Sequence, residues 1–269
     1  MAIVQPFGFF APTGISGIGY GNPTYDTGVI AYFDFGDNTD GSFRGSSGTI
    51  ANGSTAYDLS GNGYDSTLNN TSGQSVEYID SQSLGVVRAA GTKAGGRWEM
   101  ADFAGSQLGL TAFTFEFVIN TNNIFDDNVI LRFAGSGTNS RAEWNLQQYG
   151  GSPVPNRISY DQITEQNTSI PSTTTNVTIN NGWHHIVATA AVGDTTRTYY
   201  DGAALGNGST TWPVSDDVDF DETNAWMGNT NYGAGVFLGD IAVFRVYDNA
   251  MSAANVTANY NYYDSVIGF

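Results

Sequence analysis

Hydrophobic and polar residues alternate with a period of two along much of the chain after residue 28. In the segment FTFEFVI (113–119), the three phenylalanines and Ile119 fall on one face of an extended strand, and Thr114, Glu116 and Val118 fall on the other. The same criterion predicts strands at VIAYFDF (29–35), VILRFA (129–134), AEWNLQQY (142–149), RISYD (157–161) and FLGDIAVFRVYD (237–248).

One segment has the pattern of a helix. In SAANVTANYNYY (252–263), Ser252 fits the N-cap position, and Ala253, Val256 and Tyr260 fall roughly on one face. Many short strands followed by a single terminal helix predict an all-β protein. We expect an antiparallel two-sheet sandwich with one short C-terminal helix.

The composition narrows the classes of function. The 269 residues include no cysteine, which excludes disulfides, thiolate metal sites and cysteine nucleophiles. Lys and Arg number 9 against 26 Asp and Glu, so the net charge of −17 argues against nucleic-acid and membrane partners. No run approaches the roughly 20 apolar residues that a membrane-spanning helix needs.

Residues 1–27 differ from the rest. The stretch FGFFAPTGISGIGYGNPTY (7–25) combines Gly and Pro with aromatic residues and carries no charge. We therefore divide the chain into an extended arm (1–27) and one folded domain (28–269). The arm either packs along its own domain or docks on a neighbouring subunit. The first residues lack the basic region of a signal peptide, so we expect folding in a cytoplasm.

Both histidines lie in NGWHHIVATA (181–190). Neighbouring residues of a strand point to opposite faces, so His184 and His185 cannot bind one metal ion together or act together on one substrate. Asp201-Gly202 then predicts a two-residue hairpin turn within a three-stranded meander. We expect His185, Asp201 and Gly202 to have structural roles.

The same segment, NGWHHIVATA…TRTYYDGAAL, resembles the G-x-W-x-H…Y-v-D-G signature of laminin-G-like, concanavalin A-like jelly-roll domains. Further segments fit family motifs in the same order, namely AYDLSGNGYDSTL (56–68), AWMGNTNYG (225–233) and FLGDIAVFRVYDNAMSAANVTANY (237–260). The resemblance implies a two-sheet jelly roll over residues 29–260. It implies no single function, because this fold hosts lectins, glycosidases, adhesion modules and virion proteins.

The loop DLSGNGYD (58–65) carries oxygen ligands on a tight turn. Asp58, Ser60, Asn62 and Asp65 suit Ca²⁺, which is the only cofactor that the sequence suggests. The alternative is a turn in which these side chains bond to their own backbone.

Asp217, Asp219 and Asp221 alternate in SDDVDFDETNAW (215–226), which superficially resembles the E-x-D-x-E motif of glucanases with this fold. A retaining glycosidase needs two carboxylates roughly 5–5.5 Å apart. Aspartate has a shorter reach than glutamate, and this segment is a loop in related non-enzymatic domains. We therefore favour an acidic loop, with or without a cation, over catalysis.

Aromatic residues beside Gly and Asn suggest a glycan site. Tyr149, Trp226 and Tyr232 could stack on sugar rings, and the amide of Asn231 could bind sugar hydroxyls. The alternative is that each aromatic residue packs in the core or at its rim.

The arm, the absence of cysteine and the few lysines favour a non-enzymatic virion component, either a capsid decoration or a tail or fibre protein. In this interpretation the arm docks on other virion proteins in a larger assembly at the virion surface, and the domain binds host or environmental glycans. A free carbohydrate-binding module or adhesin outside the cell is the alternative. A β-glycosidase ranks third.

Overall fold

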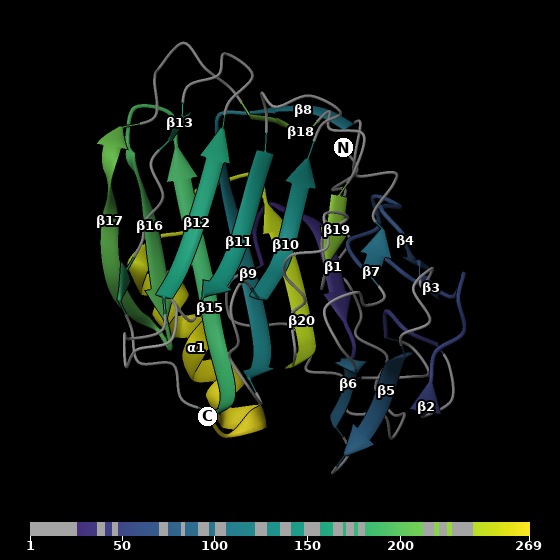
Figure 1. Cartoon of the computed structure of the whole chain (residues 1–269). Coiled ribbons are helices and arrows are strands. Elements are labelled where there is room, and N and C mark those ends of the chain that lie inside the picture. Colours follow the sequence, from purple (N-terminus) through teal and green to yellow (C-terminus); the bar gives the residue numbers. More distant parts are fainter. Residues whose placement is uncertain are drawn as a thin grey trace, which may run out of the picture.

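The computed structural model contains two antiparallel β-sheets stacked face to face and one helix on the outside of the first sheet (Figure 1). The structure describes residues 26–36, 41–44, 48–69, 75–81, 84–90, 97–99, 106–121, 128–134, 141–147, 157–163, 169–170, 175–176, 181–211, 218–220, 225–227 and 239–269. Side chains are described at 26–36, 41–44, 48–69, 98–99, 110–121, 181–205 and 239–269.

Sheet A has nine strands among the described residues, in the order β17-β16-β15-β9-β20-β6-β5-β2, with β1 also paired to β20. Its strands are β1 (Val29–Asp34), β2 (Gly48–Thr49), β5 (Ser75–Ser81), β6 (Leu84–Ala90), β9 (Ala112–Thr121), β15 (Gly182–Ala191), β16 (Thr195–Tyr200), β17 (Ala203–Thr211) and β20 (Gly239–Tyr247). Strand β20 comes last in the sequence but lies in the interior of the sheet, with β9 on one side and β1 and β6 on the other.

Sheet B also has nine strands over the described ranges, in the order β13-β12-β11-β10-β19-β7-β4-β3, with β14 paired to β12. Its strands are β3 (Thr55–Ala56), β4 (Ser66–Asn69), β7 (Arg97–Glu99), β10 (Asn128–Ala134), β11 (Arg141–Gln147), β12 (Arg157–Ile163), β13 (Ser169–Ile170), β14 (Thr175–Asn176) and β19 (Ala225–Met227). Strands β8 (Ser106–Leu110) and β18 (Val218–Phe220) form a separate small sheet.

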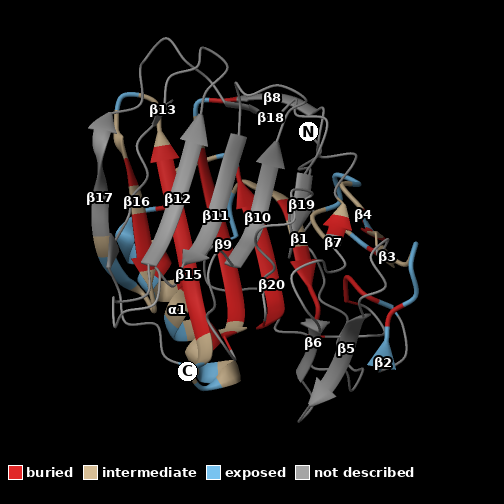
Figure 2. Ribbon diagram, viewed as in Figure 1, coloured by how far each residue is buried: buried red, intermediate tan, exposed pale blue. Residues whose placement is uncertain are grey.

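Aromatic side chains fill the space between the two sheets. Phe244 of β20 stacks on Phe117 of β9, with ring centroids 4.7 Å apart, and on Phe33 of β1 at 6.1 Å. Trp98 of β7 stacks on Phe35 at 6.2 Å and so joins sheet B to sheet A. All of these side chains are buried, and Figure 2 shows the burial running along the central strands of sheet A. The core therefore lies where the alternation of the sequence placed it.

Helix α1 (Ala253–Ile267) covers the other face of sheet A. The hydroxyl of Ser252 accepts a hydrogen bond from the backbone N–H of Asn255 at 3.2 Å, and Gly268 closes the helix in the left-handed conformation. Two apolar clusters lie beneath the helix, one around Val187 and Val256 and the other around Val118 and Tyr263. Within the described residues, no helix has the length and apolar character needed to cross a membrane.

The predicted fold class is confirmed: the chain is mostly β, with two antiparallel sheets and one terminal helix. The predicted helix and its cap at Ser252 are also confirmed, but of the three residues expected to share one face only Val256 is buried. Ala253 is exposed, and the buried residues of α1 are Val256, Asn259 and Tyr263. The reason is that a polar residue, Asn259, faces the sheet and bonds to a buried carboxylate there. Apart from Asp26 and Thr27, the predicted arm lies outside the described residues.

Candidate functional site

The outer face of sheet B is not covered by the described helix, which lies on sheet A (Figure 1). Strand β4 shows which residues belong to this outer face, because Leu68 is buried there and its neighbour Thr67 is exposed. Directly paired residues of antiparallel strands share a face. The register therefore places one row of residues on this outer face, running from β4 to β12: Thr67, Glu99, Trp226, Arg132, Glu143 and Asp161.

Polar residues extend this face beyond the row. On β11 and β12, the outer-face pairs after Glu143 are Asn145 with Ser159 and Gln147 with Arg157. The residues between them, such as Trp144 and Leu146, are apolar and take the inner positions. Sheet B thus presents hydrogen-bonding residues outward along most of its width.

Of the four residues predicted to bind glycan, Trp226 lies in β19, in the middle of the outer-face row, between Glu99 of β7 and Arg132 of β10. The other three are Tyr149, Asn231 and Tyr232, and they lie outside the described residues. Their part in the site stays a prediction.

Of the three aspartates considered for catalysis, only Asp219 falls within the described residues, and it does not lie in sheet B. Asp219 lies in β18, which pairs only with β8 among the described strands. Asp217 and Asp221 lie outside the described residues. The choice between an acidic loop and a catalytic motif therefore stays a prediction.

The loop 58–65 is built around the carboxylate of Asp58. Its Oδ1 accepts hydrogen bonds from the backbone N–H of Tyr32 and of Ser60, both at 2.9 Å. Its Oδ2 accepts the hydroxyl of Ser60 at 2.7 Å and the backbone N–H of Tyr64 at 3.1 Å. The backbone N–H of Asp58 in turn donates to Oδ1 of Asp65 at 2.8 Å. The loop is thus a turn held by its own side chains.

These bonds occupy the residues that were predicted to bind calcium. The amide of Asn62 donates to the carbonyl of Ile30 at 2.9 Å, so it also serves the turn. Asp58 already accepts four hydrogen bonds, one for each lone-pair direction of a carboxylate. Among the described side chains, no group of three or more His, Asp or Glu residues could hold a metal ion. Calcium binding stays a prediction, which the unfolding midpoint with and without calcium would test.

The two histidines occupy successive positions of β15 and make different contacts. Nδ1 of His184 lies 3.0 Å from Oδ2 of Asp201, and Oδ1 of Asp201 accepts the backbone N–H of His185 at 2.9 Å. Asp201 and Gly202 form the turn between β16 and β17 with φ values of 48° and 74°. A Cβ on Gly202 would lie 2.8 Å from Cδ1 of Tyr260, so this turn can dock on α1 because it carries glycine.

A buried polar cluster lies between sheet A and α1. Oε1 of Glu116 accepts hydrogen bonds from Nε2 of His185 at 2.8 Å and from Nδ2 of Asn259 at 3.0 Å. Oε2 accepts the hydroxyl of Tyr247. Arg245 is the cross-strand partner of Glu116 on β20. Each of these side chains belongs to a residue no more than 1% exposed. The cluster therefore fastens the helix to the sheet in the absence of solvent.

The charge state of the cluster follows from its contacts. Burial alone would raise the pKa of Glu116, but the hydrogen bond from His185 and the charge of Arg245 outweigh it, and the pKa is lowered. An ionised carboxylate only accepts hydrogen bonds, so Nε2 of His185 carries the hydrogen between them. Sequence alternation placed Glu116 on a polar face and gave no sign that a helix covers it.

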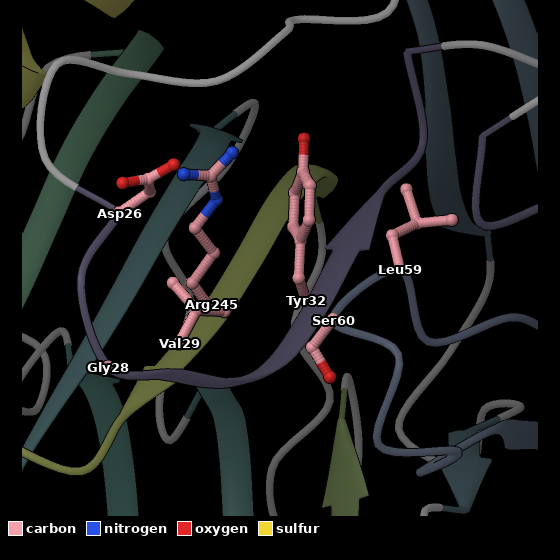
Figure 3. A pocket seen from close by; sticks show the side chains of 7 residues that line it. All are labelled: Asp26, Gly28, Val29, Tyr32, Leu59, Ser60 and Arg245. Carbon is pink, nitrogen blue, oxygen red and sulfur yellow. The ribbon is translucent and has the colours of Figure 1, made fainter. Parts of the chain in front are cut away.

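A cavity of about 240 Å³ opens beside β1 (Figure 3). It is lined by Asp26, Gly28, Val29, Tyr32, Leu59, Ser60 and Arg245. The guanidinium of Arg245 stacks on the ring of Tyr32, with Cζ 3.9 Å from the ring centroid. Glu116 of β9 is the direct cross-strand partner of Arg245. The charge of Arg245 thus acts on that carboxylate inside the fold.

Several solved structures share this architecture. Domain 4 of AbnA, a GH43 extracellular arabinanase from Geobacillus stearothermophilus solved in complex with arabinotriose, has a TM-score of 0.60 at 16% identity, over 86% of this chain and 97% of that chain. Botulinum neurotoxin type C, whose cell entry depends on interaction with two ganglioside molecules, has a TM-score of 0.54 at 11% identity, over 81% of this chain and 51% of that chain. Trypanosoma rangeli sialidase in complex with 2,3-difluoro-KDN has a TM-score of 0.56 at 14% identity, over 100% of this chain and 37% of that chain.

These likenesses show the fold alone at such low identity. The chain spans about half of the toxin chain and little more than a third of the sialidase. A search of curated protein sequences finds no match. The profile of one family, described as the concanavalin A-like lectin/glucanases superfamily, matches residues 91–257, which is well over half of the chain. With the two stacked sheets and the meander after Gly182, this match shows that the chain belongs to that superfamily, in its laminin-G-like branch.

Proposed function

We propose that this protein is a non-enzymatic glycan-binding domain that holds an oligosaccharide on the outer face of sheet B. The observation that carries the proposal is the outer-face row, in which Trp226 stands between Glu99 and Arg132. An indole ring offers a flat stacking surface to a sugar ring, and carboxylates and amides bind hydroxyl groups. The row places both kinds of residue on one face of sheet B.

The architecture supports this proposal. Among the described elements, α1 covers sheet A and leaves the outer face of sheet B open to a ligand (Figure 1). The AbnA domain, which matches this chain over nearly its whole length, was solved with arabinotriose bound. The superfamily includes lectins by its own description. Each of these facts is compatible with an oligosaccharide partner.

Replacing Trp226 with alanine should weaken glycan binding at least about tenfold, since a lost stacking contact of about 1.4 kcal/mol has that effect. A glycan array would first identify the best ligand of the wild type, and calorimetric titration would then compare the variants. Tyr57→Ala is the matched control, because Tyr57 is an exposed aromatic residue outside the row. Unchanged affinity in Trp226→Ala would remove the row from the site, and hydrolysis of the bound glycan would contradict the non-enzymatic part of the proposal.

We also infer the setting of the domain from residues 1–27. Its stretch 7–25 combines Gly and Pro with aromatic residues and carries no charge. This is the composition of a docking arm, and it supports a virion component that assembles with other virion proteins. A free carbohydrate-binding module or adhesin outside the cell is the alternative. Deletion of residues 1–27 should leave a folded monomer that no longer joins the particle. Normal assembly of the truncated protein would favour the free module.

A further inference from the structure

Basic residues are concentrated on the outer face of sheet B. The chain has only nine Lys and Arg residues against 26 Asp and Glu. The register places four of the nine on this one face, namely Arg97, Arg132, Arg141 and Arg157. With Glu99, Glu143 and Asp161 beside them, the face is close to neutral in a protein of net charge −17. An anionic ligand is repelled by most of this protein and least by this face.

The four arginines differ in their register partners. Arg132 stands directly opposite Glu143, which is an acidic residue. Arg157 stands opposite Gln147 on β11 and Asn176 on β14, and both of these are neutral amides. The next outer-face residue of β12 is Ser159, opposite Asn145.

We define the Arg157 subsite by the residues that the register gathers there: Asn145, Gln147, Arg157, Ser159 and Asn176. It combines one cation with three amides and one hydroxyl. A guanidinium recognises a carboxylate or a sulfate through two parallel N–H···O bonds. Amides and hydroxyls complement the hydroxyl groups of a sugar.

The distance between the Arg157 subsite and Trp226, the predicted stacking residue, can be spanned by one oligosaccharide. Strand β12 is three strands away from β19, which carries Trp226. In the register, Trp226 is level with Asp161, and Arg157 lies four residues further along β12. Three strand spacings across and four residues along amount to roughly 19 Å. One oligosaccharide of several units, lying obliquely across the strands, could therefore reach both positions.

We infer that the Arg157 subsite takes an acidic sugar unit, one that bears a carboxylate or a sulfate group, of an oligosaccharide in which a more distant unit lies at Trp226. This inference rests on the proposed function and adds the class of ligand to it. It assigns a separate task to two strands of the face: stacking at β19 and charge recognition at β12.

The test compares acidic and neutral glycans on the full chain. An array with neutral, uronic-acid, sialic-acid and sulfated oligosaccharides is probed first, and its acidic members should give the strongest signals. The best carboxylated oligosaccharide is then titrated beside its carboxyl-reduced, neutral form. Arg157→Gln should weaken binding of the acidic form at least tenfold and leave the affinity for the neutral form unchanged. The array also shows which of the two groups, carboxylate or sulfate, the subsite prefers.

Two further variants serve as controls for Arg157→Gln. Arg197→Gln removes the same charge from β16 of sheet A, where Arg197 pairs with Asp194 at 2.8 Å, and should change neither affinity. Arg157→Lys keeps the charge but loses the planar fork, so the affinity for the acidic form should be intermediate. Thermal unfolding would verify that each variant is folded.

The outcomes separate the inference from the function on which it rests. Equal binding of acidic and neutral forms, with no effect of Arg157→Gln, overturns the acidic subsite. The proposed function would then stand on the loss of binding in Trp226→Ala. If no oligosaccharide of either kind binds to the wild type, the subsite and the proposed function both fall.

Discussion

Replacing Glu116 with alanine should lower the free energy of unfolding by about 3–5 kcal/mol at neutral pH. Its carboxylate is the common acceptor for His185, Asn259 and Tyr247, and none of these groups can turn to solvent instead. Removal of the carboxylate leaves three buried donors without their acceptor and the buried charge of Arg245 without its cross-strand neighbour. Losses of this size are exceptional for a single substitution.

Urea unfolding at pH 7 would measure this loss. Asp248→Ala is a suitable control, because Asp248 is exposed, and its effect should stay within about 0.5 kcal/mol. Because Asn259 ties α1 to Glu116, amide hydrogen exchange should also become faster in residues 253–267 than in β9. A loss below about 1 kcal/mol for Glu116→Ala would mean that the apolar clusters alone hold the helix.

Acid should weaken the fold through the same carboxylate. Burial acts to raise the pKa of Glu116, but the hydrogen bond from His185 and the charge of Arg245 more than offset it. A carboxylate whose pKa falls on folding adds stability above its unfolded pKa, which is about 4.3 for glutamate. That contribution is lost as the pH falls through the lower folded value. It should therefore be complete above about pH 5 and decline below about pH 4.

The variant Glu116→Gln isolates this contribution, since glutamine has nearly the same shape and does not titrate. The difference in unfolding free energy between wild type and Glu116→Gln should be largest near neutral pH and shrink in acid. Asp194, whose pKa is lowered by the backbone N–H of Thr195 and by Arg197, is present in both proteins and cancels in the difference. Urea titrations at several pH values would measure it. A difference that stays constant into acid would assign the acid sensitivity to other groups.

The inner layer of the fold could be predicted from the sequence because it depends on local alternation. Phe113, Phe115 and Phe117 share one face by position alone, and all three are buried between the sheets. The same alternation places Glu116 on a polar face, which a strand of a two-layer sandwich would turn to water. The burial of Glu116 could not be predicted from local alternation, because it depends on a tertiary contact with Asn259, which lies 143 positions away in the sequence.

The outer-face row could not be predicted from the sequence either, although the two faces of each single strand could. Within β11, the polar residues Glu143, Asn145 and Gln147 alternate with apolar ones, so one strand shows its own faces. The juxtaposition of Trp226 with Arg132 depends on the pairing of β19 with β10, which are far apart in the sequence. Register between distant strands follows from the whole fold and not from either segment.

The interior position of β20 has a consequence for how the protein is made. Residues 239–247 are made long after β1 and β9, yet both of these strands pair with them. Until then, both strands have unpaired edges that can recruit other chains. Sheet A can therefore close only after residues 239–247 have been made, and these edges of β1 and β9 stay unpaired while the residues in between are translated.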